Sequence, residues 1–441
     1  MRFGIRCAVS ILTVVALSVF GLASVGAADG DQSRESIFIS SDEHFNPANG
    51  VRSGSGTKSD PYVISGWTVD RIHLRDTSAA VVIRDNVITS SLVLNWNGGN
   101  VKVVDNEIGD LRVNQNIERT GEPTSGLIAR NTIGVVGQIR HFDGVFQKNV
   151  VTGERPDGFV ALPFFGSGQA VNFDGFHGSR FRDNKINGFV TVRLHGHHHG
   201  SGYTKNSHYH GAAKEHESQD DMVDHTQRYH QVFVTGNTIT SPGPYALNYV
   251  DTAHAANDRT AASETNEALN KPHVHHTKVH MNNNRLIGSG LYVNVFNADD
   301  ERHLGTRRGH LELKNNRIEL VQEGDRGPFS YEEPAGISIH QAKDVHMRIT
   351  GNTITNEVEA NALRDADVPL FVQYETSGIR LYRIEKSEIH IGNNSVASTN
   401  YGVFAQHMPA SVDWWVHGLA LKQVPMDVYW DNTVVNQPSR D

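Results

Sequence analysis

The sequence predicts an all-β solenoid, in which short strands stack coil on coil. A pattern centred on one asparagine recurs eleven times, with an apolar residue three positions before the asparagine and an aliphatic residue two positions after it. A length of 441 residues suits one large solenoid, and a single cysteine excludes a disulfide scaffold. The shared asparagines are Asn86, Asn106, Asn131, Asn149, Asn184, Asn237, Asn284, Asn316, Asn352, Asn394 and Asn432.

Each copy of the pattern predicts one strand that ends before the asparagine and a second strand that begins after it. Val101 and Val103 would point inward and Lys102 outward, as the twofold alternation of a strand requires. We expect asparagine at the corner because it tolerates the left-handed conformation of a sharp turn. The corner amides of stacked coils can then bond to the copies above and below. One coil cannot bury its apolar face alone, so the coils must stack.

The first 28 residues predict an export signal. Arg2 and Arg6 precede an apolar run over residues 8–25, and the small residues at 26–28 suit cleavage by a signal peptidase. Cleavage would remove the only cysteine and leave 38 basic side chains (40 − 2) against 49 acidic ones, a formal charge of −11. That charge argues against nucleic acid as a partner, and no later stretch is apolar enough to span a membrane. We expect a secreted, periplasmic or cell-surface protein.

Behind the signal, the sequence predicts a lead-in over residues 29–50 and one solenoid over residues 51–436. Successive asparagines are 20, 25 and 18 residues apart at first, and between 32 and 53 residues apart afterwards. Because a β-coil needs roughly 20 to 25 residues, the longer intervals contain either an extra unmarked coil or an inserted loop. We expect insertions at about residues 195–230 and 251–276.

Two segments near the start carry a resemblance to a known family. Residues 53–57 (SGSGT) and 60–67 (DPYVISGW), followed by the repeats, resemble the entry into the right-handed parallel β-helices of NosD and carbohydrate-binding or sugar-hydrolase type, within the pectate-lyase-like superfold. The resemblance implies a single-stranded right-handed parallel β-helix with His-rich loop insertions. It also implies an extracellular protein that works on polysaccharide or handles copper.

Histidine is concentrated in the predicted insertions, because 15 of the 25 histidines lie between His177 and His280. Without cysteine, metal ligands would be imidazoles and carboxylates, which suit copper first and zinc second, and no organic cofactor is expected. The alternatives are an opportunistic metal-binding tract, or histidines that bind sugar or act as acid and base. The candidate metal ligands are His195, His197, His199, His208, His210, His216, Asp220, Asp224, His225, His230, His273 and His275.

A second group of polar residues stands at fixed offsets before the corner asparagine, four or six positions upstream, or on a nearby strand. If coils stack in register, these side chains line one outer face as a groove for an acidic polysaccharide. An ordinary solvated strand face is the competing interpretation. The residues are Arg180, His280, His310, His340, His346, Arg348 and His390.

The alternative function is a polysaccharide lyase or glycoside hydrolase acting on an acidic glycan. Such chemistry needs a cation for the uronate carboxylate, a base and an acid. No Arg-x-Pro-x-x-Arg run typical of pectate lyases is present, so an enzyme is not established, and a passive binding module is a third possibility. The oligomeric state stays open. The candidate catalytic residues are Arg193, His195, His197, Tyr203 and Tyr209.

Three tryptophans stand near the C-terminus, at Trp414, Trp415 and Trp430. An open solenoid end must be covered to prevent edge pairing, and we expect these side chains to cap the last coils. Stacking on sugar rings is the alternative.

Overall fold

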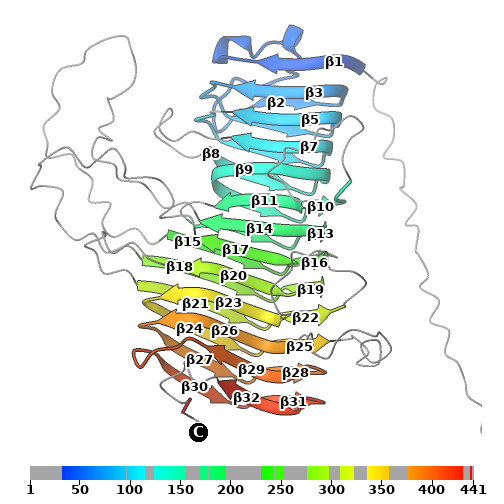
Figure 1. Ribbon diagram of the computed structural model, residues 1–441. Coiled ribbons are helices and arrows are strands. Elements are labelled where there is room, and N and C mark those ends of the chain that lie inside the picture. Colours follow the sequence, from blue (N-terminus) through cyan, green and yellow to red (C-terminus); the bar gives the residue numbers. More distant parts are fainter. Residues whose placement is uncertain are drawn as a thin grey trace, which may run out of the picture.

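The computed structural model describes residues 32–95, 97–114, 124–154, 169–175, 178–194, 230–241, 245–251, 276–296, 308–321, 335–356, 376–430 and 438–439. The predicted export signal and most of both predicted insertions lie outside these residues. Within them, all pairings between named strands are parallel, and the strands stack into one elongated solenoid (Figure 1). The prediction of an all-β parallel β-helix is confirmed.

Each coil contributes to three parallel sheets. Sheet 1 consists of the strands that precede the corner asparagine or its equivalent. These strands are β2 (Tyr62–Ser65), β4 (Val81–Arg84), β6 (Val101–Val104), β8 (Thr124–Ala129), β12 (Ser179–Arg182), β15 (His230–Thr235), β18 (His276–Asn282), β21 (Arg308–Lys314), β24 (Val345–Thr350), β27 (Glu388–Gly392) and β30 (Asp413–His417).

Sheet 2 follows the corner and sheet 3 closes the coil. Sheet 2 contains β10 (Val150–Val151), β13 (Lys185–Asn187), β16 (Thr238–Thr240), β19 (Arg285–Gly288), β22 (Arg317–Leu320), β25 (Thr353–Asn356), β28 (Ser395–Ala397) and β31 (Ala420–Lys422). Sheet 3 contains β11 (Gln169–Gly175), β14 (Phe189–Leu194), β17 (Leu247–Asp251), β20 (Leu291–Phe296), β23 (Ala335–Lys343), β26 (Ser377–Glu385), β29 (Tyr401–Gln406) and β32 (Met426–Trp430).

The first coils run through the bend between sheets 2 and 3 without a break. The continuous strands are β1 (Gln32–Ile39), β3 (Trp67–Arg75), β5 (Val87–Asn95), β7 (Glu107–Asn114) and β9 (Thr132–Gln147). β9 pairs with β10, β11 and β12 in turn, so this one strand contributes to all three sheets. Two 3-10 turns, η1 (Asp42–His44) and η2 (Pro47–Asn49), follow β1. None of the described helices is long and apolar enough to cross a membrane.

The two longest intervals between asparagines contain inserted segments and no additional coil, whereas the last interval, from Asn394 to Asn432, contains the coil of β30, β31 and β32 with Leu419 at the corner. β12 pairs directly with β15, and β15 pairs directly with β18, although Asn184, Asn237 and Asn284 are 53 and 47 residues apart. These three asparagines therefore stand in consecutive coils. The surplus residues leave the coil between β14 and β15 and between β17 and β18, which is where insertions were predicted.

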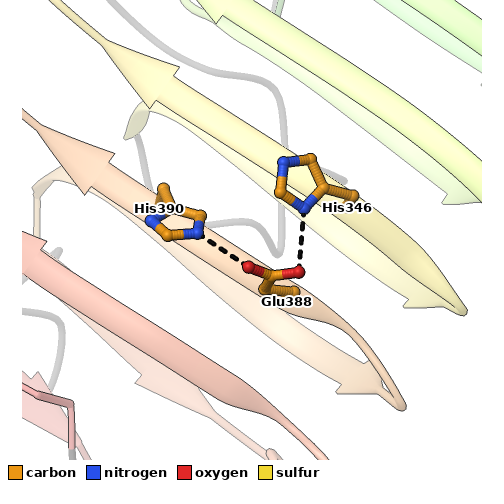
Figure 2. A group of neighbouring side chains, drawn as sticks. All are labelled: His346, Glu388 and His390. Carbon is orange, nitrogen blue, oxygen red and sulfur yellow. Dashed lines mark hydrogen bonds and ion pairs between the residues drawn. The ribbon is translucent and has the colours of Figure 1, made fainter.

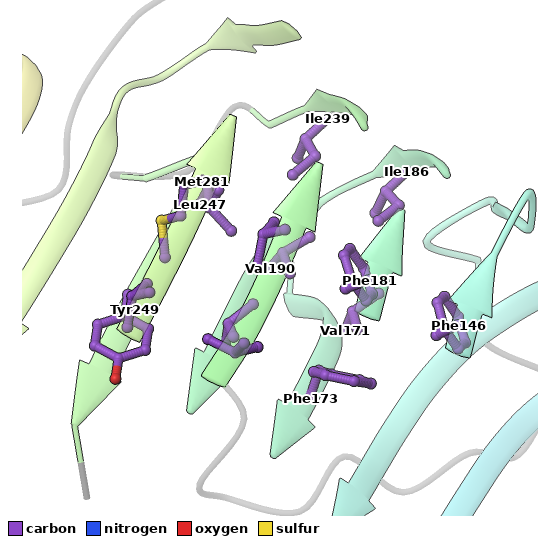
Figure 3. Packing of buried hydrophobic residues seen from close by; sticks show 14 of the residues in the cluster. Phe146, Val171, Phe173, Phe181, Ile186, Val190, Ile239, Leu247, Tyr249 and Met281 are labelled. Carbon is purple, nitrogen blue, oxygen red and sulfur yellow. The ribbon is translucent and has the colours of Figure 1, made fainter. Parts of the chain in front are cut away.

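Inward-facing side chains from the three sheets fill the interior of the solenoid. Phe146 and Phe181 stack with ring centroids 5.1 Å apart, and Phe173 packs against both (Figure 3). Tyr249 and Met281, from the coils that follow, are also fully buried. Like side chains stack on like because strands in register place equivalent positions about 4.8 Å apart. The burial of this continuous column is the main stabilising term of the fold.

At the C-terminal end, two of the three tryptophans pack on the last coils. Trp414 is 2% exposed and belongs to the core, and Trp430 packs against the core from a partly buried position. Trp415 lies on the outer face of sheet 1, and a bridge pairs its backbone with Ser439.

A ladder of buried asparagines runs along the corner between sheets 1 and 2. From Asn86 to Asn394, ten side-chain amides lie in consecutive coils, and each of the first nine donates from Nδ2 to Oδ1 of the next at 2.9 to 3.2 Å. Each Nδ2 also donates to a backbone carbonyl, as Asn237 does to Phe181 at 3.0 Å. The predicted bonding between stacked amides is confirmed. Asn432 lies outside the described residues, and the strand before it, β32, belongs to sheet 3, so the prediction that the eleventh copy marks the same corner is wrong.

The predicted conformation of the corner asparagine is wrong by one position. The left-handed residue is the one before it, with φ between 54° and 69° in all ten copies, as at Lys148 (φ 54°) and Gly236 (φ 69°). The tight turn is made by this exposed or half-exposed residue. The asparagine itself is at most 4% exposed, because its amide must point inward to reach the amides above and below.

Replacing Asn237 with alanine should destabilise the solenoid strongly. The change removes the acceptor for Nδ2 and the backbone N–H of Asn184 and leaves Asn284 Oδ1 without its side-chain donor, all in a buried setting. We expect a loss of about 3 to 5 kcal/mol, since each unsatisfied buried group costs about 1 to 3 kcal/mol. Urea unfolding followed by circular dichroism measures it. The exposed Asn187→Ala variant is the matched control, and equal midpoints for both would contradict the ladder's role.

Candidate functional site

The outer face of sheet 1 carries a dense group of imidazoles and carboxylates across β18, β21, β24 and β27. Residues four positions before the corner asparagine form one row, and residues six positions before it form a second row beside the first. In the first row His280 is opposite Glu312, Glu312 is opposite Arg348, and Arg348 is opposite His390. In the second row His310 is opposite His346, which is opposite Glu388. The shared register of the coils therefore converts fixed sequence offsets into spatial neighbours.

Three of these side chains converge on one point (Figure 2). Glu388 Oε2 lies 3.1 Å from Nδ1 of His346, and Glu388 Oε1 lies 2.9 Å from Nε2 of His390. The strand geometry explains the meeting: His346 faces Glu388 across the β24–β27 pair, and His390 follows Glu388 by two residues on the same face. Each residue offers one ligand atom, and these atoms lie within 4.8 Å of one another, so the group could hold a metal ion.

The group is half open to solvent and carries an ionised carboxylate. The side chains of His346, Glu388 and His390 are 36%, 50% and 31% exposed. Hydrogen bonds from His390 and then from His346 hold the pKa of Glu388 below its ordinary value. Glu388 is therefore an anion at neutral pH, which is the form that binds a cation. An ion could reach the three ligand atoms from solvent without rearrangement of the core.

Aromatic rings continue the group in both directions along sheet 1. Successive ring centroids lie 4.9, 5.9, 5.4, 5.6 and 4.6 Å apart, so the six rings form an unbroken row over six strands. The two outermost pairs and the central imidazole pair are stacked, and the other contacts are tilted. Four imidazoles are thus held between a phenyl ring and an indole. The members of this ring row are Phe233, His280, His310, His346, His390 and Trp415.

A second carboxylate lies two strands away from Glu388. Glu312 Oε2 is 3.2 Å from Nδ1 of His280, and its Oε1 accepts from Nδ2 of Asn282 at 3.2 Å. His310 lies two residues before Glu312 on the same face. Burial lowers the pKa of His310, and the imidazoles of His346 and His280 and the ammonium of Lys278 lower it further, although Glu312 opposes this. His310 is therefore neutral at neutral pH and presents a basic nitrogen.

The proposed groove is brought together only in part. His280, His310, His346, Arg348 and His390 share the outer face of sheet 1, in two neighbouring rows. Arg180 belongs to the same face further along the solenoid, where its guanidinium lies 5.8 Å from the ring of Phe233.

Two other candidates lie on sheet 3, namely His340 of the predicted groove and Arg193 of the predicted catalytic set. His340 on β23 stacks on Tyr382 with ring centroids 4.6 Å apart, and it stands three strands from Arg193 in one row of that sheet. Neither residue belongs to the ring row.

Of the candidates in the predicted insertions, the structure describes only the backbone of His230. His230 begins β15, where its backbone pairs with Thr277. The others lie outside the described residues, namely His195, His197, His199, Tyr203, His208, Tyr209, His210, His216, Asp220, Asp224, His225, His273 and His275. Their role as metal ligands or as catalytic groups stays a prediction.

Sequence reasoning missed Glu388 and Trp415. Glu388 stands six positions before Asn394, the same offset as His310 and His346 from their own asparagines, so the pattern that singled out the imidazoles also marks this carboxylate. Trp415 gave no such signal, because β30 is followed by Leu419 where earlier coils have the corner asparagine. Only the register of β27 with β30 places its indole on His390.

Comparison of the chain with protein-family models, with curated proteins and with solved structures finds no match. The resemblance to parallel β-helix proteins is thus supported by the architecture, a solenoid of three stacked parallel sheets, and not by a family match.

The depressed pKa of His310 gives a testable expectation. Replacing His346 with alanine removes one neighbouring imidazole and part of the burial, so the pKa of His310 should rise toward 6.5. NMR titration of the imidazole protons measures this, with the His310 signal assigned from a His310→Gln variant. An unchanged or lower pKa in His346→Ala would refute the expectation. Because the folded state binds fewer protons at His310 than the unfolded state does, this residue's contribution to stability falls as pH drops below about 6.5.

Proposed function

We propose that this protein binds a transition metal ion on the outer face of sheet 1, through His346, Glu388 and His390. The observation that carries the proposal is the convergence of two imidazole nitrogens on both oxygens of one carboxylate, at 2.9 and 3.1 Å. Two ligand atoms that share a tetrahedral ion are about 3.3 Å apart, given metal–ligand bonds of about 2.0 Å. An ion could thus replace the two hydrogen bonds, because the three ligand atoms already lie within 4.8 Å of one another.

The donor set supports copper first and zinc second. Two imidazoles and one carboxylate suit borderline metals, and copper(II) has the highest affinity of the divalent first-row metals for such a site. Three protein ligands leave at least one coordination position for water or another ligand. Binding requires that the two facing nitrogens carry no proton, so each imidazole would move its proton to the other nitrogen, and affinity would fall in acid.

The ring row provides a built-in reporter for this site. The indole of Trp415 stacks on His390 at 4.6 Å, so copper(II) on His390 should quench its fluorescence. We expect the first equivalent of copper(II) that fills the site to quench a tryptophan component that Trp415→Phe lacks. A His346→Ala/His390→Ala variant should bind one ion fewer per chain in equilibrium dialysis and should show no quenching of Trp415.

Two controls separate this site from other imidazoles. Trp415→Phe should lose the reporter and keep the full number of ions. His407→Asn removes an exposed imidazole directly after β29, where asparagine tolerates the left-handed φ of 54°, and should change neither quantity. Equal numbers of bound ions in the wild type and in His346→Ala/His390→Ala, both folded by circular dichroism, would refute the proposal.

We further propose that the protein acts outside the cytoplasm, in association with polysaccharide. The proposal is supported by the export signal predicted over residues 1–28, by the absence of cysteine from the sequence after it, and by the Arg and His side chains of sheet 1. The lyase or hydrolase alternative has no further support from the described residues.

A further inference from the structure

The construction around Glu388 occurs a second time on sheet 1. In the first instance His346 faces Glu388 across a strand pair, and a second histidine lies two residues from Glu388 on the same strand. In the other instance His280 faces Glu312 across the β18–β21 pair, and His310 lies two residues from Glu312 on β21. The order along the strand is reversed, Glu-x-His in β27 and His-x-Glu in β21. The residue types are the same, and in both groups the facing histidine belongs to the preceding coil.

In the second group, only one imidazole contacts the carboxylate, whereas two do so in the first. Only His280 contacts the carboxylate of Glu312, at 3.2 Å, and the other oxygen accepts from Asn282. Within the described part of the chain, the ring nitrogens of His310 make no hydrogen bond, while its ring stacks on His346 at 5.4 Å and lies 5.9 Å from His280. An imidazole whose ring nitrogens make no hydrogen bond among the described residues, beside a carboxylate that already contacts another imidazole, is a partly assembled ligand set.

We propose that His280, His310 and Glu312 form a second site for a transition metal ion, beside the first. Rotation of the His310 side chain toward Glu312, which is its neighbour on the same face, completes the set. The two carboxylates lie two strands apart, so the ions would be separated by roughly 10 Å, too far to share one ligand. The stacked pair of His310 and His346 would lie between them.

Charge makes the second site the weaker one. Arg348 is opposite both Glu312 and His390, so its charge acts on both sites. Lys278 is opposite His310 and repels an ion at the second site, and Asn282 competes for Glu312. We expect an affinity about tenfold lower than at His346, Glu388 and His390, since one unit charge a few ångströms away at a half-exposed surface has an effect of this order.

The test is a copper(II) titration of the full chain and of a His280→Ala/Glu312→Gln variant. The variant should bind one ion fewer per chain and keep the Trp415 quenching at its wild-type midpoint, because the first site is intact. Glu107→Gln, which neutralises an exposed carboxylate on β7, is the matched control and should bind as many ions as the wild type. Electron paramagnetic resonance should show dipolar broadening from the ion pair in the wild type and less of it in the variant.

The outcomes distinguish this inference from the proposed function on which it builds. An unchanged number of ions in the variant overturns the second site and leaves the first. If the His280→Ala/Glu312→Gln variant loses both one bound ion and the Trp415 quenching, the second site is also overturned. The ligands of the two groups would then form one joint site. If the variant loses one ion while His346→Ala/His390→Ala loses none, the second site stands and the proposed function fails. Should the variant not fold, an anomalous-scattering map of copper-loaded wild-type crystals decides the matter, and density at Glu388 alone refutes the second site.

Discussion

The asparagine ladder at the corner between sheets 1 and 2 is the interaction on which the rest of the structure depends. Each of the ten amides donates to a backbone carbonyl, and in the first nine both the side chain and the backbone N–H also donate to the next amide, as at Asn237. Since these groups are buried, a coil that slipped by one residue would leave several of them without partners, at a cost of about 1 to 3 kcal/mol each. The ladder therefore holds ten coils in one register.

A common register has a consequence far from the corner. Positions four and six residues before the asparagine fall into two rows on the outer face of sheet 1, so each side chain there has neighbours from the coils before and after it. Aromatic and imidazole rings in those rows stack at 4.6 to 5.9 Å, although the residues are up to 47 positions apart in the chain. The buried corner thus positions the exposed rows, and insertions between the coils do not disturb them.

The exposed rows combine charges in a way that an ordinary solvated strand face would not require. Four imidazoles in contact would repel one another if all were protonated, and Lys278 and Arg348 add to the positive potential. Glu312 and Glu388 offset part of it, each through direct contact with imidazoles. The lowered pKa values of His310 and Glu388 leave one neutral imidazole and one anionic carboxylate in these rows at neutral pH, which is the protonation state that a metal ion selects in such ligands.

The sequence by itself determined the class of fold, the strands on either side of the asparagines from Asn86 to Asn394, the hydrogen bonding between the amides, and the polar offsets on the outer face. These are local patterns with a fixed period, and a period can be read from one chain. It misassigned the left-handed residue by one position, because the asparagine and the residue before it are both compatible with a turn, and only the inward amide distinguishes them. Only the tertiary structure decided that the two longest intervals contain no extra coil, that His340 lies on another sheet, and that Glu388 joins His346 to His390. Each of these depends on which strands are paired across 40 residues or more, and local periodicity carries no information about that pairing.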